Sequence, residues 1–301
     1  MVLCVRYGVV GLTLAAAASA PLPAAAILTD FPSDGAAAGV EVAAAGATIE
    51  ISHLAFSVAQ VECFKRSKLI ARATGFFYAS AGDIYLITNR HVVRSEEADH
   101  LPDKLKLRLH TDAADIRRND VYVVRLYDRD GQRRWLEHPT GDVDVVAIPL
   151  DTGRLQARYV VRPFGLEDHL PEEVVIQVGE DVLVFGYPLG LYDVAYNLPL
   201  VRRGTLASFY PIPFGGRPYF LMECRLHRGC SGSPVLTKAG GLMQTRSASP
   251  EMFLSRGFYL LGVSSARVEK RREGEGEEPL GLNEVWFAYL IPEIIAQDKA
   301  E

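Results

Sequence analysis

The stretch from His227 to Val235 combines polar residues with glycines and then runs into an apolar segment. A serine hydroxyl near its free pKa is a poor nucleophile, so it needs a base within hydrogen-bond reach and donors for the oxyanion that its attack creates. Glycine at 229 and 232 lets the backbone turn tightly, expose the Ser231 hydroxyl and aim the amides of Gly229 and Ser231 at one point. Ser231 is therefore a candidate nucleophile, and a plain Gly-Ser loop between strands is the alternative for these residues alone.

A base for Ser231 has to come from the seven histidines of the chain. His91 follows the apolar run 84–88 and precedes two valines, which predicts a position at the end of a strand, on the rigid kind of element that a catalytic base requires. We expect five others to be surface or satisfied core residues, because they have no distinctive neighbours: His53, His100, His110, His138 and His169.

An orienting carboxylate for His91 is offered by Asp144, which directly precedes the apolar run 145–150. A carboxylate at the edge of such a run can be buried against an imidazole, where it fixes the tautomer and stabilises the imidazolium that forms in the reaction. The alternative interpretation is an aspartate in a turn that leads into a strand.

The elements that must position these residues are short runs of β-branched or aromatic residues, separated by turns, from Thr48 to about Leu290. This pattern predicts an all-β fold, a pair of barrels or a sandwich, and lacks the long helices of an α/β sheet. A terminal helix is predicted at 292–300, and the charged stretches 94–104 and 269–278 are predicted to be surface loops. The clearest strands are expected at 75–78, 83–88, 104–109, 121–126, 174–178, 182–185 and 258–263.

The composition is ordinary for a globular protein: 301 residues, 49% hydrophobic and 23% charged, with a formal net charge of −5. Acidic and basic residues are interspersed, which argues against nucleic acid as a partner, since phosphate binding calls for a concentrated basic face. No cysteine spacing resembles a metal site, and we predict no metal and no cofactor.

The N-terminus has the pattern of an export signal over residues 1–26: an arginine, an apolar run, and then small residues around the preferred cleavage site at Ala24–Ala26. The apolar run is short for a membrane span, so no span is expected after signal removal; an uncleaved anchor is the alternative. Residues 27–47 are rich in Ala and Gly and are predicted to be a flexible lead-in. For Cys63, Cys224 and Cys230, one disulfide plus a free thiol and three free thiols are both open.

Four short motifs follow one another along the chain: Ala73–Phe76, Leu86–Val93, Asp144–Ile148 and Gly229–Pro234. They resemble the successive motifs of trypsin-like serine peptidases, and the bacterial HtrA (Deg) branch is the one they resemble most. Three lesser motifs agree with that branch: Phe185–Gly190, Arg203–Ser208 and Trp286–Pro292. The resemblance covers residues from about 48 to 297.

The resemblance implies a peptidase domain over 48–301, made of two packed six-stranded antiparallel β-barrels at about 48–160 and 161–297, with a short C-terminal helix. It implies that His91 is the general base, that Asp144 orients it, that Ser231 attacks the scissile carbonyl, and that the amides of Gly229 and Ser231 form the oxyanion hole. Asp144 rather than Asp142 keeps the family's register. The order His, Asp, Ser argues against an α/β-hydrolase, in which the nucleophile comes first.

The sequence departs from the family pattern at three positions near the site: Arg90 replaces a small residue, Cys230 replaces Asp or Asn, and Ser233 replaces glycine. No Arg-Ile-Val-Gly-Gly-like start is present, so activation by cutting a propeptide is not expected. No PDZ domain is expected after Pro292 either, and the regulated chaperone-protease behaviour of the HtrA branch is not carried over.

Specificity is open between two interpretations. Arg225 and His227 favour an acidic side chain next to the cut through charge-assisted pairing, or else Arg225 points to solvent beside a small apolar pocket. Val263 and Ser264 lie in a segment that resembles the strand to which extended substrates pair.

The sequence thus predicts an exported serine endopeptidase, secreted or periplasmic, that acts on polypeptide substrates. A catalytically silent or latent trypsin-like fold that binds proteins is the alternative from another class. An esterase with the same triad would share the chemistry. The oligomeric state is not determined by the sequence.

Overall fold

The computed structural model describes residues 53–95, 100–238, 242–246, 251–254, 257–272 and 275–299, all within one compact unit, residues 50–301. The predicted signal, the lead-in and the expected strand at Thr48–Ile51 lie outside the described residues. Within the described part, no helix has the length and apolar character that crossing a membrane requires.

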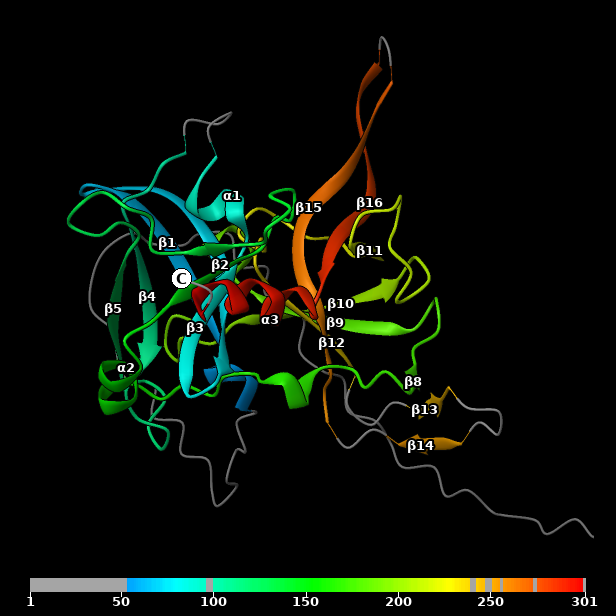
Figure 1. The fold of residues 1–301 in the computed structure, drawn as a ribbon, viewed down its shortest axis with the longest axis horizontal. Helices are drawn as coiled ribbons and strands as arrows, with labels where there is room; N and C mark the ends of the chain where they lie inside the picture. The colour runs from blue at the N-terminus through cyan, green and yellow to red at the C-terminus, as the bar shows by residue number, and fades with distance from the viewer. Residues whose placement is uncertain are drawn as a thin grey trace, which may run out of the picture. The chain divides into compact units, whose positions relative to one another are not determined.

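The first half of the described chain forms a seven-stranded antiparallel sheet in the order β5-β4-β1-β2-β3-β7-β6 (Figure 1). Its strands are β1 (Val58–Lys65), β2 (Lys68–Ser80), β3 (Asp83–Thr88), β4 (Lys104–His110), β5 (Asn119–Arg125), β6 (Leu136–Glu137) and β7 (Val146–Pro149). The alternation of buried and exposed residues along β4 matches the strand period of two, so one face of this strand is buried in the core.

The second half forms a closed six-stranded antiparallel barrel in the order β10-β11-β16-β15-β12-β9. Its strands are β9 (Asp181–Gly186), β10 (Leu200–Leu206), β11 (Tyr219–Glu223), β12 (Pro234–Thr237), β15 (Leu260–Arg272) and β16 (Glu275–Phe287). A separate three-stranded sheet contains β8 (Val174–Val175), β13 (Leu242–Thr245) and β14 (Met252–Leu254).

The predicted all-β fold is confirmed, with one difference in detail. The second half is the expected six-stranded barrel, whereas the first half is a seven-stranded sheet rather than a second six-stranded barrel. The extra strand is β6, which has two residues and lies at the edge beside β7. A two-residue edge strand is set by its neighbour and not by a periodic pattern of its own, so sequence periodicity does not reveal it.

The C-terminal helix is confirmed as α3 (Leu290–Ile295), followed by the 3-10 turn η4 (Ala296–Lys299). It begins two residues before the predicted start, and Pro292 lies in its first turn, where a helix needs no backbone donor. The sequence did not predict the two other short helices, α1 (Arg90–Val93) and α2 (Thr152–Arg158). The remaining 3-10 turns are η1 (His53–Phe56), η2 (Leu166–Asp168) and η3 (Pro188–Gly190).

The prediction that 269–278 is a surface loop is wrong. The described residues of this stretch continue β15 and β16 as a long hairpin, visible in Figure 1, with residues 273 and 274 outside the described part. The register pairs Lys270 with Glu278 and Arg272 with Glu275. Strand pairing therefore stabilises this stretch, and the overall charge of the stretch did not reveal that pairing.

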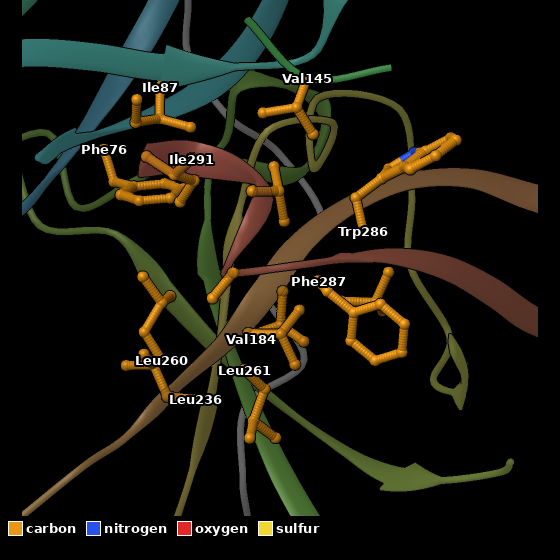
Figure 2. Close-up of a cluster of buried hydrophobic side chains, with 14 of the residues drawn as sticks. Phe76, Ile87, Val145, Val184, Leu236, Leu260, Leu261, Trp286, Phe287 and Ile291 are labelled. Atoms are coloured by element: carbon orange, nitrogen blue, oxygen red, sulfur yellow. The ribbon is translucent and has the colours of Figure 1, made fainter. Parts of the chain in front are cut away.

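One cluster of buried side chains joins the sheet to the barrel. It combines Phe76 and Ile87 of the sheet with Leu236 and Leu261 of the barrel, and Ile291 of α3 belongs to the same cluster (Figure 2). Burying one such side chain contributes roughly 1.5–3 kcal/mol. Segments at the junction are therefore anchored from both halves, and the candidate site lies on these segments.

Candidate active site

His91 and Asp144 are brought together by two neighbouring strands. His91 is the second residue of α1, so it lies three residues beyond β3 and not at the strand end that the sequence predicted. Asp144 precedes β7 by two residues. Because Thr88, the last residue of β3, pairs with Val146, the first residue of β7, the two segments lie side by side.

The Asp144 carboxylate accepts three hydrogen bonds. Its Oδ2 lies 2.7 Å from His91 Nδ1, and its Oδ1 accepts from the His91 amide at 3.0 Å. Ser265 Oγ of β15 donates to Oδ2 at 2.5 Å. The His91 side chain is 41% exposed and that of Asp144 is 19% exposed, so the imidazole is open to a reactant while the carboxylate is shielded.

The electrostatics of this pair favour an ionised carboxylate. Burial alone would raise the pKa of Asp144, but the hydrogen bonds and charge of His91, with the Ser265 hydrogen bond, outweigh it, so the pKa lies below its usual value. An ionised Asp144 requires a proton on His91 Nδ1, which leaves Nε2 as the acceptor. This is the tautomer that a general base needs.

The loop that carries Asp144 is tied to the residues before His91. Asn89 is fully buried, and its Nδ2 donates to the Asp144 carbonyl oxygen at 2.7 Å. Arg90 Nη1 donates to the carbonyl oxygen of Gly141. Arginine at position 90, a departure from the family pattern, therefore links the loop to α1.

Ser231 is the second residue of the later of two consecutive turns, which share Cys230. The Cys230 amide donates to the His227 carbonyl at 3.1 Å, and the Ser233 amide donates to the Cys230 carbonyl at 3.0 Å. The third residue of each turn is a glycine with positive φ, Gly229 at 95° and Gly232 at 83°. Type II turns require a positive φ at this position, which explains why both residues are glycines.

The amides of Gly229 and Ser231 are oriented by the carbonyls of the same peptide units. The Arg228 carbonyl accepts from Leu189 N of η3 at 2.5 Å, and the Cys230 carbonyl is held by Ser233. In a trans peptide the N–H points opposite to the C=O, so the amides of Gly229 and Ser231 point away from these partners. Across the described ranges neither amide donates a hydrogen bond of its own, and both are available to an oxyanion.

Thr74 of β2 holds the turn against the sheet. It is fully buried; its amide donates to the Ser231 carbonyl at 2.9 Å, and its Oγ1 donates to the Gly229 carbonyl at 2.7 Å. The same Oγ1 accepts from the Tyr187 amide at 3.0 Å. A single residue, through its amide at Ser231 and its hydroxyl at Gly229, thus holds the nucleophile turn at two points.

The turn approaches the His91 segment closely without a direct bond to the imidazole. A Cβ placed on Gly232 would lie 2.4 Å from Thr88 Oγ1 and 2.2 Å from the Thr74 carbonyl oxygen, so the turn touches the end of β3, three residues before His91. Among the described residues, no hydrogen bond joins Ser231 to His91. In unliganded sites such bonds are often long and tighten only with substrate.

Ser233, the third departure, is matched by a glycine on a neighbouring strand. A Cβ at Gly186 of β9 would lie 2.2 Å from Ser233 Oγ, so the missing side chain at 186 makes room for the serine.

The three cysteines of the domain, Cys63, Cys224 and Cys230, are buried free thiols. Of the two arrangements open from the sequence, the structure has three thiols.

The predicted specificity residues have different environments. Arg225 is exposed and His227 is half-buried. Val263 is fully buried, so its side chain faces the core. Ser264 donates from its amide to the Ser233 carbonyl and accepts from the Gly232 amide, both at 2.9 Å, so its backbone holds the nucleophile turn.

Sequence reasoning missed three residues that hold the site. Thr74 stands in a quoted motif, but nothing in the sequence shows which backbone groups its hydroxyl contacts. Ser265 adjoins the predicted substrate strand, and its bond to Asp144 spans 121 positions. Leu189 has a positive φ of 56°, which is unusual for a residue with a side chain, and lies next to the glycine of a proline turn.

In the part of the chain that is described, no cluster of His, Cys, Asp or Glu is suited to holding a metal ion.

Comparisons with known proteins identify one family and several similar solved structures. The family described as "Trypsin-like peptidase domain" matches residues 73–243, more than half of the chain. No curated protein matches.

Among solved structures, an inactive mutant form of Rv3671c from M. tuberculosis H37Rv is similar at 16% identity and a TM-score of 0.43, over 81% of this chain and 87% of that one. The serine endoprotease from Yersinia pestis is similar at 13% identity and a TM-score of 0.45, over 83% and 67% of the two chains. The active form of the Rv3671c protease is similar at 17% identity and a TM-score of 0.41, over 80% of each chain.

Proposed function

The chain belongs to the family of trypsin-like peptidase domains, and on this premise we propose that it is a serine endopeptidase that hydrolyses polypeptides through Ser231, His91 and Asp144. Ser231 Oγ attacks the scissile carbonyl carbon while His91 Nε2 takes the hydroxyl proton. Asp144 stabilises the imidazolium, and His91 returns the proton to the leaving amine. Water then attacks the acyl-enzyme while His91 Nε2 takes its proton. His91 returns that proton to Ser231 Oγ as the acid product leaves.

The oxyanion in this mechanism is received by the amides of Gly229 and Ser231. Removing one such donor costs roughly 10²–10³-fold in rate in enzymes of this chemistry. The single observation that carries the proposal is the contact of 2.7 Å between His91 Nδ1 and the shielded carboxylate of Asp144. The Gly229 and Ser231 amides, which donate no hydrogen bond within the described ranges, support it.

Covalent labelling with a fluorophosphonate tests the proposal directly. Wild-type protein is expected to gain one probe mass on the peptide that contains Ser231, and Ser231→Ala and His91→Ala are expected to lose the labelling. Cleavage of an unfolded protein substrate by the same samples then separates a peptidase from an esterase. A wild-type protein that takes up no probe over pH 5 to 9 would contradict the proposal.

Substrate pairing is proposed along the free edge of β15. The pairing of β12 with β15 ends at Val263, so the backbone edge of β15 that follows Ser264 is not covered by β12. An extended chain can add to such an edge by main-chain hydrogen bonds, which read shape more than sequence. Peptides that vary only the residue before the cut test whether Arg225 favours an acidic side chain there; equal cleavage of Glu and Val peptides would exclude that preference.

A protein-binding module without turnover is the second candidate. The observation that favours it is that Ser231 and His91 share no hydrogen bond within the described ranges. A protein that binds unfolded chains but neither labels nor cleaves would support this candidate.

We also propose that residues 1–26 direct export, with the mature protein periplasmic or secreted, because their composition fits a cleavable signal. N-terminal sequencing of the exported protein is expected to begin at Ile27. Recovery of an intact Met1 from the membrane fraction would favour an anchor instead.

A further inference from the structure

A basic groove begins at the oxyanion turn and crosses the outer face of the first sheet. A cavity of about 410 Å³ is lined by Gly229, Arg228 and Leu189 together with Leu69–Arg72 of β2. A second cavity of about 230 Å³ shares Arg72 and continues over β1 and β4 to Lys106 and Arg108. The two cavities meet at Arg72, so we treat them as one groove.

The charge of the groove opposes that of the chain. Its lining has four cations, Arg228, Arg72, Lys106 and Arg108, and a single carboxylate, Glu62, whereas the chain carries a net charge of −5. Glu62 is the register partner of both Arg72 and Lys106 and accepts from Arg72 Nε at 3.2 Å. One carboxylate therefore stands between two cations, and the groove keeps an excess of positive charge.

The turn η3 positions this groove against the reaction centre. Leu189 N holds the Arg228 carbonyl, and a Cβ at Gly190 would lie 2.4 Å from Arg72 Cδ, so the glycine lets the arginine stem pass. Gln60 Nε2 donates to the Gly190 carbonyl at 3.0 Å. Arg228 is exposed and lines the first cavity together with Gly229.

The proposed pairing of the substrate with β15 puts the groove on the side of the site where the leaving group departs. The nucleophile turn meets β15 at its Gly232 end and η3 with β2 at its Gly229 end. If residues before the cut pair with β15, as proposed above, an extended substrate continues past Gly229 toward Arg72. Neighbouring strands lie about 4.8 Å apart and an extended chain spans about 3.3 Å per residue, so roughly three residues cross from β2 to β4.

We propose that this groove binds an acidic segment of the polypeptide substrate, from the second to about the fifth residue after the cut, through Arg228, Arg72, Lys106 and Arg108. Charge-assisted pairing of arginine with carboxylates supplies the selectivity. This inference rests on the proposed peptidase function, and it names the substrate class of the same site.

The test compares two peptides that are identical except for four residues after the cut, Glu in one and Gln in the other. Wild-type protein is expected to cleave the Glu peptide with at least a ten-fold higher kcat/KM at about 50 mM salt, and the ratio is expected to approach one near 1 M salt, where the Debye length is about 3 Å. The double variant Arg72→Glu with Lys106→Glu is expected to abolish the preference for the Glu peptide. If this double variant does not fold, the double variant Arg72→Gln with Lys106→Gln replaces it in the test.

The matched control is Arg129→Glu, a charge reversal at an exposed position outside the groove, which is expected to keep the ratio of the two peptides. Equal or faster cleavage of the Gln peptide at low salt would overturn the inference and leave the peptidase proposal standing. Absence of both cleavage and probe labelling would contradict the peptidase proposal instead. In that case the binding of the two peptides to the Ser231→Ala protein is measured by fluorescence anisotropy. A ten-fold tighter Kd for the Glu peptide supports the proposed role of the groove, and equal Kd values overturn it.

Discussion

The part of the site on the seven-stranded sheet and the part beside the barrel are held by different kinds of bond. Asp144 is held by side chains, those of His91, Asn89 and Ser265, with one backbone amide. The nucleophile turn is held almost wholly by backbone hydrogen bonds, with Thr74 as the main side chain. Deleting a functional group should therefore damage the first part, whereas adding an atom should damage the second.

The largest effect is expected from Asp144→Asn. The amide cannot hold the same imidazole tautomer, so the rate of probe labelling should fall roughly 10³–10⁴-fold, while the fold is retained because the shape of the side chain is unchanged. The measurement is the labelling rate at pH 7, together with circular dichroism.

Asp142→Asn is the control for this prediction, since Asp142 lies two residues earlier and accepts from Thr140 Oγ1 at the surface. Its labelling rate should stay within about two-fold of wild type. An equal loss in both variants would show that Asp144 has no special role.

Gly232→Ala is expected to damage the backbone-held part. The new Cβ would meet the Thr74 carbonyl oxygen at 2.2 Å, and alanine is strained at a φ of 83°. Labelling should fall at least ~10²-fold because the Ser231 amide moves, and the free energy of unfolding should fall by roughly 2–4 kcal/mol.

Gly131→Ala separates strain from collision for this prediction. Gly131 also has a positive φ, 79°, but nothing lies within 4 Å of a Cβ there. We expect a loss of about 1 kcal/mol in urea unfolding and unchanged labelling. Similar behaviour of both alanine variants would contradict the close packing of the turn.

Thr74→Val sharpens the comparison, because it removes the one side chain that holds the turn and keeps its volume. The buried carbonyl of Gly229 and amide of Tyr187 lose their partner, which costs about 1–3 kcal/mol for each group. We expect labelling to slow roughly 10- to 100-fold as the oxyanion donors shift.

Thr237→Val is the matched control: this buried threonine accepts from the Tyr259 amide, on the far end of β12. It should lose stability with little change in labelling. Equal slowing in both variants would mean that general loosening, and not the Thr74 contact, affects the site.

The smallest effect is expected at the seam between the two halves, away from the site. His169 contacts Tyr78 Oη at 2.9 Å through Nε2, and burial lowers its pKa from 6.5 to about 4. Between these values the unfolded chain binds a proton that the folded chain does not, so stability falls as pH drops from 6.5 toward 4 and is unaffected above 6.5. The loss between pH 7 and pH 5 should be about 1–2 kcal/mol.

Urea unfolding of wild type and His169→Gln at the two pH values checks this expectation. Burial also lowers the pKa of His110, which acts in the same direction, so the difference between the two proteins isolates His169. Identical pH slopes would refute its contribution.

Much of the fold could be predicted from the sequence because strands are short local patterns. The expected strands at 83–88, 104–109 and 121–126 correspond to β3, β4 and β5, with β5 shifted by one or two residues, and the C-terminal helix was displaced by only two. The failures were β6, the short helices α1 and α2, and the hairpin over 269–278. The strand β6 and the hairpin are stabilised by their partner strands and not by a local pattern. The helices α1 and α2 have only four and seven residues, too few for a clear helical period.

By itself the sequence determined the residue types: a serine between glycines, a histidine after an apolar run, an aspartate before another, and glycines wherever the turn needs positive φ. Only the tertiary structure decided what holds them. Three contacts hold the site, and each joins positions that are 39 to 155 residues apart: Thr74 with Gly229, Ser265 with Asp144, and Leu189 with Arg228. A hydrogen bond depends on distance and angle in space, and these are set only when the sheet and the barrel pack together.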